Sequence, residues 1–343
     1  MSLTMALAIA GAVLLLALLA HGWWNARRAS PRRADPPSAA AAARIEPSLD
    51  GADDPAAAPG AAARAPTRRS ARIDALIDAI VPLSLEAPVS GEAVLAHWPA
   101  TRRAGTKPFL IEGLDQASGD WAQPEPGRRY TELQAGLQMA NRSGALNEIE
   151  YSEFVQKVQA FAESVGALPD FPDMLDVVAR ARELDAFAAP VDAQLTLRLV
   201  AKSVAWSVGY VQQCAARRQM VPGVVPGRLV LPGAQEGDPP VLALEFDPQA
   251  ALADDPHSAA LREVRLILDV PQTAAALEPF PLWHETAHAL AEDMDAAMLD
   301  DAGRPITLHA FDAIGKELAE LYAKLELHDL AAGTPAARRL FAG

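Results

Sequence analysis

The pattern of hydrophobic and polar positions beyond residue 190 predicts a sheet with helices. The segment 195–200 alternates apolar and polar residues, which is typical of a strand with one buried face. We predict strands at 195–200, 228–231, 241–246, 264–270 and 297–299. We predict helices at 206–217 and 280–294, and a final helix that begins after the N-cap Thr307 and ends near Leu327. Because strands and helices are intermixed and the middle strands are closely spaced, we expect an α+β fold with a largely antiparallel sheet and helices on one face.

The upstream region 71–188 carries a weaker version of the same pattern. The segment Ala291–Ala296 has a counterpart at Ala162–Ala167, and Arg262–Val270 has one at Thr131–Met139, with offsets of 129 and 131 residues. We therefore expect a module at 71–188 that is a degenerate copy of a second module at 190–330, followed by a tail at 331–343. A single larger domain is the alternative, since shared α+β periodicity produces some of this similarity.

The N-terminal end of the chain is predicted to cross a membrane. Residues 3–24 carry no charge, end in Trp23 and Trp24, and are long enough as a helix for a hydrocarbon core of ~30 Å. A cleaved signal peptide would need basic residues before the apolar run, but the Arg cluster at 27–33 follows it. We expect a single-pass helix in the cell inner membrane, a periplasmic N-terminus, a disordered Ala/Pro/Arg-rich linker at 25–70 and cytoplasmic modules.

Charge and cysteine content narrow the function classes. The formal net charge is −14, and the residues after 72 alone carry −18, so the folded part repels phosphate backbones and nucleic acid is not an expected partner. The single cysteine, Cys214, excludes an internal disulfide and fits a reducing compartment. It lies in a helical pattern, where we expect a buried structural thiol.

One motif could carry catalysis. His284-Glu285-x-x-His288 lies in a predicted helix, where a spacing of four residues puts both imidazoles on one face for Zn²⁺ with the glutamate as general base. The matching upstream positions are Val155, Gln156 and Gln159, and His309 and Glu317 are poorly placed as third ligands. We therefore expect no enzyme, no metal and no other cofactor. A membrane-anchored zinc metallopeptidase is the alternative.

The ends of the chain resemble the ZipA family of bacterial cell-division proteins. The resemblance rests on Leu18–Trp24 followed by arginines, on the strand Val264–Pro271, and on the helix–strand–helix pattern from 280 to 327. It covers residues 3–28 and about 190–328; the short linker and the module at 71–188 depart from the family pattern. The resemblance implies a membrane-anchored adaptor that binds the C-terminal tail of FtsZ and tethers the Z ring during septum assembly, with other divisome proteins as further candidate partners.

In ZipA-like proteins the FtsZ tail lies on the sheet face that the helices leave uncovered. If the leucines at 195, 197, 199, 242, 244, 266 and 268, with Phe246 and Val264, face the helices, the opposite pleat carries a different set. Small apolar residues flanked by arginine suit an acidic peptide with Leu, Ile and Phe anchors. The predicted peptide-binding residues are Thr196, Arg198, Val200, Val230, Val241, Ala243, Glu245, Arg265 and Ile267.

Overall fold

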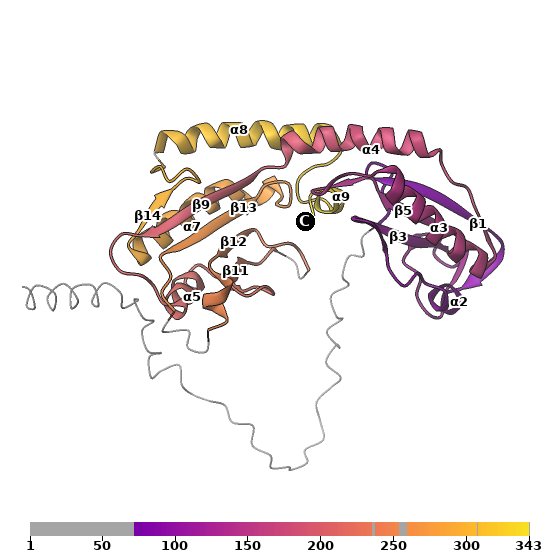
Figure 1. Ribbon diagram of the computed structural model, residues 1–343, viewed down its shortest axis with the longest axis horizontal. Helices are drawn as coiled ribbons and strands as arrows, with labels where there is room; N and C mark the ends of the chain where they lie inside the picture. The colour runs from indigo at the N-terminus through magenta and orange to yellow at the C-terminus, as the bar shows by residue number, and fades with distance from the viewer. Residues whose placement is uncertain (1–71, 235–236, 254–258, 307, 343) are drawn as a thin grey trace, which may run out of the picture. The chain divides into compact units, whose positions relative to one another are not determined.

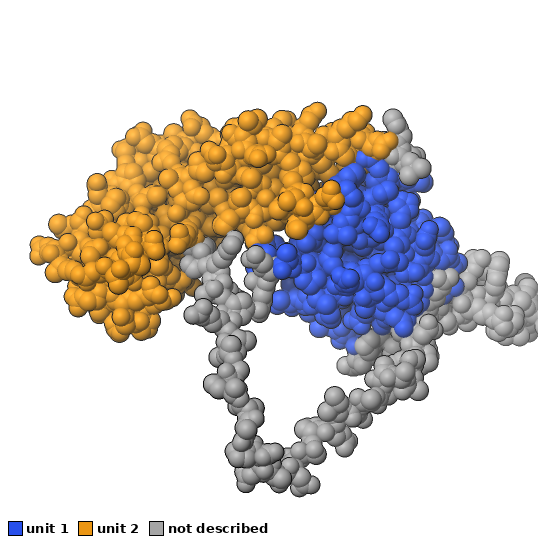
Figure 2. All heavy atoms as spheres, turned by 180° about the vertical axis from the view of Figure 1, so that it is seen from behind, with its two compact units in different colours: residues 1–68, 195–268, 279–311 blue, residues 69–194, 269–278, 312–343 orange. Residues whose placement is uncertain are grey.

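The computed structural model describes residues 72–342, except 235–236, 254–258, 307 and the side chains of 308 and 309. These residues form two compact units: 195–268 with 279–311 make unit 1, and 72–194, 269–278 and 312–342 make unit 2 (Figure 2). The predicted membrane helix at 3–24 and the predicted linker at 25–70 lie outside the described residues. Within the described part, no helix combines the length and apolar character needed to span a bilayer.

Unit 2 contains the first sheet (Figure 1). Its strands run in the order β2-β3-β5-β1-β8, with β4 paired to β3, and every pairing is antiparallel. The elements are β1 (Asp78–Ser90), α2 (Gly91–Ala96), β2 (Arg103–Ala104), β3 (Lys107–Asp115), β4 (Trp121–Ala122), β5 (Arg129–Gln138), the hairpin β6 (Ala140–Asn141) and β7 (Gly144–Ala145), α3 (Glu148–Val165), β8 (Ala167–Pro169) and α4 (Met174–Ala188).

Helix α3 covers one face of this sheet because both elements are apolar on that side. Alternate residues of β1, β3 and β5 form one buried cluster with Phe154, Val158 and Phe161 of the helix. The helix begins with a capping box, in which the Asn147 side chain accepts backbone N–H groups and Glu150 binds back to the N-cap. These contacts position α3 over the inner face of the sheet.

The second sheet has the strand order β10-β11-β12-β13-β9-β14. Its strands lie within two residues of the predicted segments; the two-residue strand β10 was not predicted. The elements that follow α4 along the chain are β9 (Gln194–Ala201), α5 (Val208–Ala216), β10 (Val221–Pro222), β11 (Arg228–Leu231), β12 (Leu242–Glu245), α6 (Pro248–Ala251), β13 (Glu263–Asp269), α7 (Pro279–Met294), β14 (Ala296–Leu299), α8 (Leu308–Leu327) and α9 (Pro335–Leu340), of which most of α8 and all of α9 belong to unit 2.

Two buried tryptophans join the second sheet to α7. Trp283 donates its indole N–H to the carbonyl of Leu266 in β13 at 3.2 Å, and Trp206 donates to the carbonyl of Met294 at 2.7 Å. Both rings are almost fully buried, so their N–H groups need these partners. We call the face of each sheet that packs against α3 or α7 its inner face, and the opposite face its outer face.

The two sheets have the same connections. In each, an opening strand (β1 or β9) pairs with the last strand (β8 or β14) on one side and with β5 or β13 on the other. Helices α3 and α7 both lead directly into that last strand through a residue in the left-handed conformation, Gly166 with φ 70° and Asp295 with φ 53°. The prediction of a mixed fold with antiparallel sheets and helices is confirmed.

The C-terminal segment is more ordered than a tail. Residues 331–343, which we expected to be a tail, contain helix α9, capped by the Thr334 side chain. Ala337, Leu340 and Phe341 are buried in a second cluster of unit 2, together with Ile77 and Leu325. The end of the chain therefore packs against the residues that lead into β1.

Candidate peptide-binding face

An apolar row crosses the outer face of the second sheet. Val230 of β11 pairs with Ala243 of β12, which pairs with Ile267 of β13. Their neighbours Leu244 and Leu266 point to the inner face and are fully buried, whereas Val230 and Ile267 are half-buried. The alternation along 264–270 therefore follows the predicted register.

A charged row lies directly beside the apolar row. Arg228, Glu245 and Arg265 are paired across β11, β12 and β13. Arg228 Nε lies 3.5 Å from Glu245 Oε1, and Arg265 Nε lies 3.2 Å from Glu263 Oε1. Arg198 of β9 donates two hydrogen bonds, of 2.9 and 2.6 Å, to the carboxylate of the same Glu263. The strands thus hold three arginines and two glutamates in one band.

The ion pairs keep these groups charged. The pKa of Glu263 is lowered by its hydrogen bond from Arg198, against the opposing effect of burial, and Arg265 lowers it further. The same hydrogen bond raises the pKa of Arg198. The band holds three arginines and two glutamates, but Asp247 lines the cavity beside it, and Asp300 and Asp301 lie close enough to Arg198 to raise its pKa. An acidic group bound here can therefore pair with an exposed arginine, Arg265 or Arg228, although the acidic neighbours offset the positive charge of the band.

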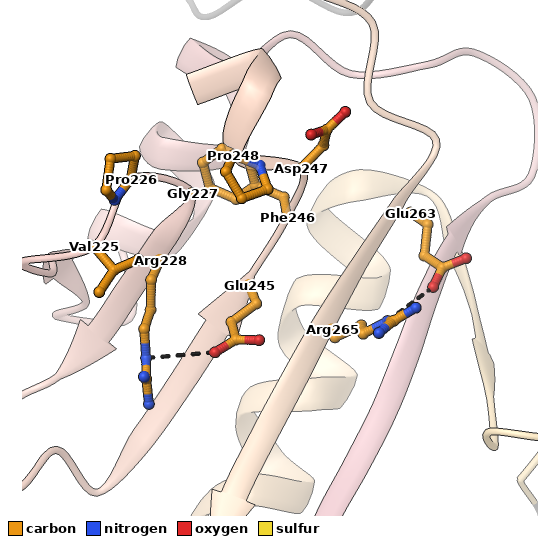
Figure 3. Close-up of a pocket in the computed structure, with 10 residues that line it drawn as sticks. All are labelled: Val225, Pro226, Gly227, Arg228, Glu245, Phe246, Asp247, Pro248, Glu263 and Arg265. Atoms are coloured by element: carbon orange, nitrogen blue, oxygen red, sulfur yellow. Dashed lines mark hydrogen bonds and ion pairs between the residues drawn. The ribbon is translucent and has the colours of Figure 1, made fainter. Parts of the chain in front are cut away.

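Four residues of the charged band, all except Arg198, line one side of a cavity of about 510 Å³ (Figure 3). The loop before β11 and the turn after β12 close its end, because the N–H of Phe246 donates to the carbonyl of Gly227 at 2.9 Å. A side chain at 227 would not fit, since a Cβ there would lie 2.6 Å from the carbonyl oxygen of Phe246. The lining residues are Val225, Pro226, Gly227, Arg228, Glu245, Phe246, Asp247, Pro248, Glu263 and Arg265.

Most of the predicted face residues lie together. Val230, Ala243 and Ile267 form the apolar row, and Arg198, Glu245 and Arg265 belong to the charged band. The remaining three follow the same alternation: Thr196 and Val200 are half-buried positions of β9, and Val241 is a buried residue just before β12. Leu195, predicted to face the helices, is only half-buried.

The predicted set of face residues did not include Arg228, Glu263 or the segment 221–227. Arg228 and Glu263 share the parity of the predicted residues on β11 and β13, so the alternation alone could have included them. The segment 221–227, which is β10 and the loop that follows it, carries the apolar run Val221-Pro-Gly-Val-Val-Pro226, in which Val224 is fully exposed. An exposed run of this kind beside a cavity was the available signal.

The HExxH segment lies on α7. The rings of His284 and His288 are 4.6 Å apart between centroids, and the His284 ring lies 4.0 Å from that of Phe311. Glu285 and Glu317 are exposed. Among the described residues, which exclude the His309 side chain, no three His, Cys, Asp or Glu side chains are grouped as a metal site. The Nε2 of His284 is buried without a described hydrogen-bond partner, and burial followed by repulsion from His288 lowers the pKa of His284.

No family model matches this chain, and no curated protein sequence matches it significantly.

Proposed function

We propose that this protein is a ZipA-like adaptor of cell division. In this proposal the outer face of the second sheet binds the C-terminal tail of FtsZ, and residues 3–24 anchor the complex in the inner membrane. The adaptor would tether and stabilise the Z ring during septum assembly. The observation that carries the proposal is the apolar row Val230–Ala243–Ile267 lying beside an arginine-rich band.

The chemistry of this face suits an extended acidic peptide. The half-buried valine and isoleucine offer apolar surface to an aliphatic or aromatic anchor, and a fully buried anchor of that size contributes about 1.5–3 kcal/mol. Arg265 and Arg228, with side chains 59% and 40% exposed, are available to carboxylates of the ligand. The cavity at the end of the band could hold one bulky side chain of the peptide.

The repeated strand plan supports an internal duplication. The hydrogen bond from Met139 N to Ile77 O in the first sheet, 2.8 Å long, has a counterpart from Val270 N to Ala193 O at 3.0 Å. These two pairs differ by 131 and 116 residues, and the same two offsets relate β5 to β13 and β1 to β9 throughout. We propose that the first sheet is a degenerate ZipA-like module and the second the functional one.

The experiment that tests the function is a calorimetric titration of the full chain, in detergent micelles, with a synthetic FtsZ tail peptide. We expect saturable binding that weakens as salt rises, because part of the attraction is electrostatic. A peptide of the same composition in scrambled order is the control. Binding of both peptides alike, or of neither, would refute the proposal.

The topology has its own test. A reporter fused after Gly343 that works only in the cytoplasm should be active, and the same fusion to a reporter that works only in the periplasm should be silent, because the arginines after residue 24 favour the cytoplasmic side. Activity of the periplasmic reporter would show that the predicted orientation is wrong.

A further inference from the structure

The first sheet carries a segment of its own chain on its outer face. Residues 72–77, which we call the leading segment, precede β1. The backbone N–H of Ile73 donates to Glu112 Oε1 of β3 at 3.1 Å. The Ile73 side chain lies over Gly136 of β5, because a Cβ built on Gly136 would be 2.6 Å from Ile73 Cγ2. Gly136 is paired with Ile80 on one side and Leu110 on the other, so Ile73 sits in a notch between two apolar residues.

Two buried carboxylates receive the backbone of this segment. Glu112, 3% exposed, accepts the Ile73 N–H, and Asp78, 1% exposed, accepts the Asp74 N–H at 2.8 Å. Arg339 of α9 completes the arrangement, since its guanidinium binds the Asp78 carboxylate and donates to the carbonyl of Arg72 at 2.7 Å. The leading segment is therefore held by side chains from three separate parts of unit 2.

The positions that hold the leading segment correspond to the predicted peptide site of the second sheet. The offset of 131 residues that relates β5 to β13 places Gly136 at Ile267 and Gln134 at Arg265. Gln134 pairs with Glu112 on β3, and Arg265 pairs with Glu245 on β12. Glu112 therefore corresponds to Glu245. The same outer-face positions are filled by the chain itself in one sheet and are half-exposed in the other.

We propose that the leading segment is a resident ligand of the first sheet, occupying the site that a partner peptide occupies on the second. This inference rests on the proposed function for the identity of that partner. The recognised class is a short segment with a branched aliphatic residue followed by an acidic one, as in Ile73-Asp74, which leads into a turn at 75–77. Each chain then offers one open site, and Glu245 accepts a backbone N–H of the bound peptide as Glu112 does for Ile73.

The test uses the full chain in micelles and a synthetic peptide of residues 70–78 as the probe. Ile73→Asp should release the leading segment, because it replaces the half-buried aliphatic group by a carboxylate close to Glu112. We expect this variant to bind one more equivalent of the probe than the wild type, and the amides of residues 73 and 74 to lose protection from hydrogen exchange. Leu76→Asp is the matched control: Leu76 belongs to the same segment but is 43% exposed, so stoichiometry and protection should stay unchanged.

The outcomes separate the two proposals. Equal stoichiometry in the wild type and Ile73→Asp, or protection that survives in Ile73→Asp, would overturn the resident-ligand proposal. A probe carrying Asp in place of Ile73 should bind several-fold to about tenfold more weakly, which is the effect expected from losing a half-buried aliphatic side chain. Failure of the FtsZ tail peptide to bind the wild type would instead count against the proposed function, while an additional equivalent of the probe on Ile73→Asp would still support the resident ligand.

Discussion

Leu266 and Ile267 are consecutive residues of β13 whose side chains face opposite sides of the sheet. Leu266 is fully buried on the inner face, and its carbonyl accepts the indole N–H of Trp283. Ile267 is half-buried on the outer face and pairs with Ala243. The same substitution at the two positions should therefore have opposite consequences for folding and for binding.

We expect Leu266→Glu to unfold the second sheet, at a cost of more than about 4 kcal/mol, because it places a charge in the core without a partner. Ile267→Glu should change the melting temperature little. It should weaken binding of the FtsZ tail about ten- to a hundredfold, since it removes apolar contact and repels an acidic ligand. Thermal melting and calorimetric titration of both variants measure this. A reversed pattern would mean that the proposed binding residues lie on the wrong face.

The charged band makes a second prediction about binding. Arg265→Ala should weaken the tail peptide several-fold at low salt and less at high salt, because exposed charges are screened. Folding should be nearly unaffected, since the ion pair between Arg265 and Glu263 is largely solvent-exposed. The matched control is Arg262→Ala, an exposed arginine just before the same strand that lines no part of the cavity. Equal losses in the two variants would point to a general charge effect and not to a site.

The HExxH segment gives a third prediction. Metal analysis of the purified protein should find no stoichiometric zinc, because the ring of Phe311 packs against His284 and the described residues group no third ligand with the pair. The double change His284→Ala with His288→Ala should lower the melting temperature modestly through lost packing and leave cell division intact. One zinc per chain in the wild type, lost in the double variant, would favour the peptidase alternative.

The strands of the second sheet could be read from the sequence because they alternate. In β13 the period-two pattern separates Leu266 from Ile267 without any tertiary information, and this fixed which residues lie on the outer face. The upstream segments that match at offsets of 129 and 131 residues also coincide with elements of the structure: Ala162–Ala167 lies in α3 and β8, and Thr131–Met139 lies in β5 and the residue after it. What alternation cannot supply is the pairing partner: the bidentate contact of Arg198 with Glu263 joins strands 65 residues apart.

Other features were hidden for a different physical reason. Ile73 precedes the first strand and carries no periodic pattern, so its position over Gly136 depends on a glycine 63 residues away. Helix α9 is only six residues long and is held by contacts of Arg339 and Phe341 with distant parts of unit 2. Helices this short have little stability of their own, so local sequence signals are weak.

Stability of the second sheet should depend on pH through His284. Burial, followed by repulsion from His288, lowers the pKa of His284 below its usual 6.5 in the folded protein. The stabilising contribution of the neutral ring is therefore complete above about pH 6.5 and is lost as the pH falls through the lower folded pKa, because the unfolded chain takes up the proton first. Denaturant unfolding at pH 7.5 and 5.0 should show this loss in the wild type.

The variant His284→Phe keeps an aromatic ring beside Phe311 but cannot be protonated, so it should lose less stability than the wild type between the two pH values. The control is His97→Gln, since His97 is exposed and lies in unit 2. This control should retain the pH dependence of the wild type for unfolding of the second sheet, followed through hydrogen exchange of the buried indole N–H groups of Trp206 and Trp283. An equal acid-induced loss in the wild type and His284→Phe would show that other groups, and not this imidazole, set the acid sensitivity of the sheet.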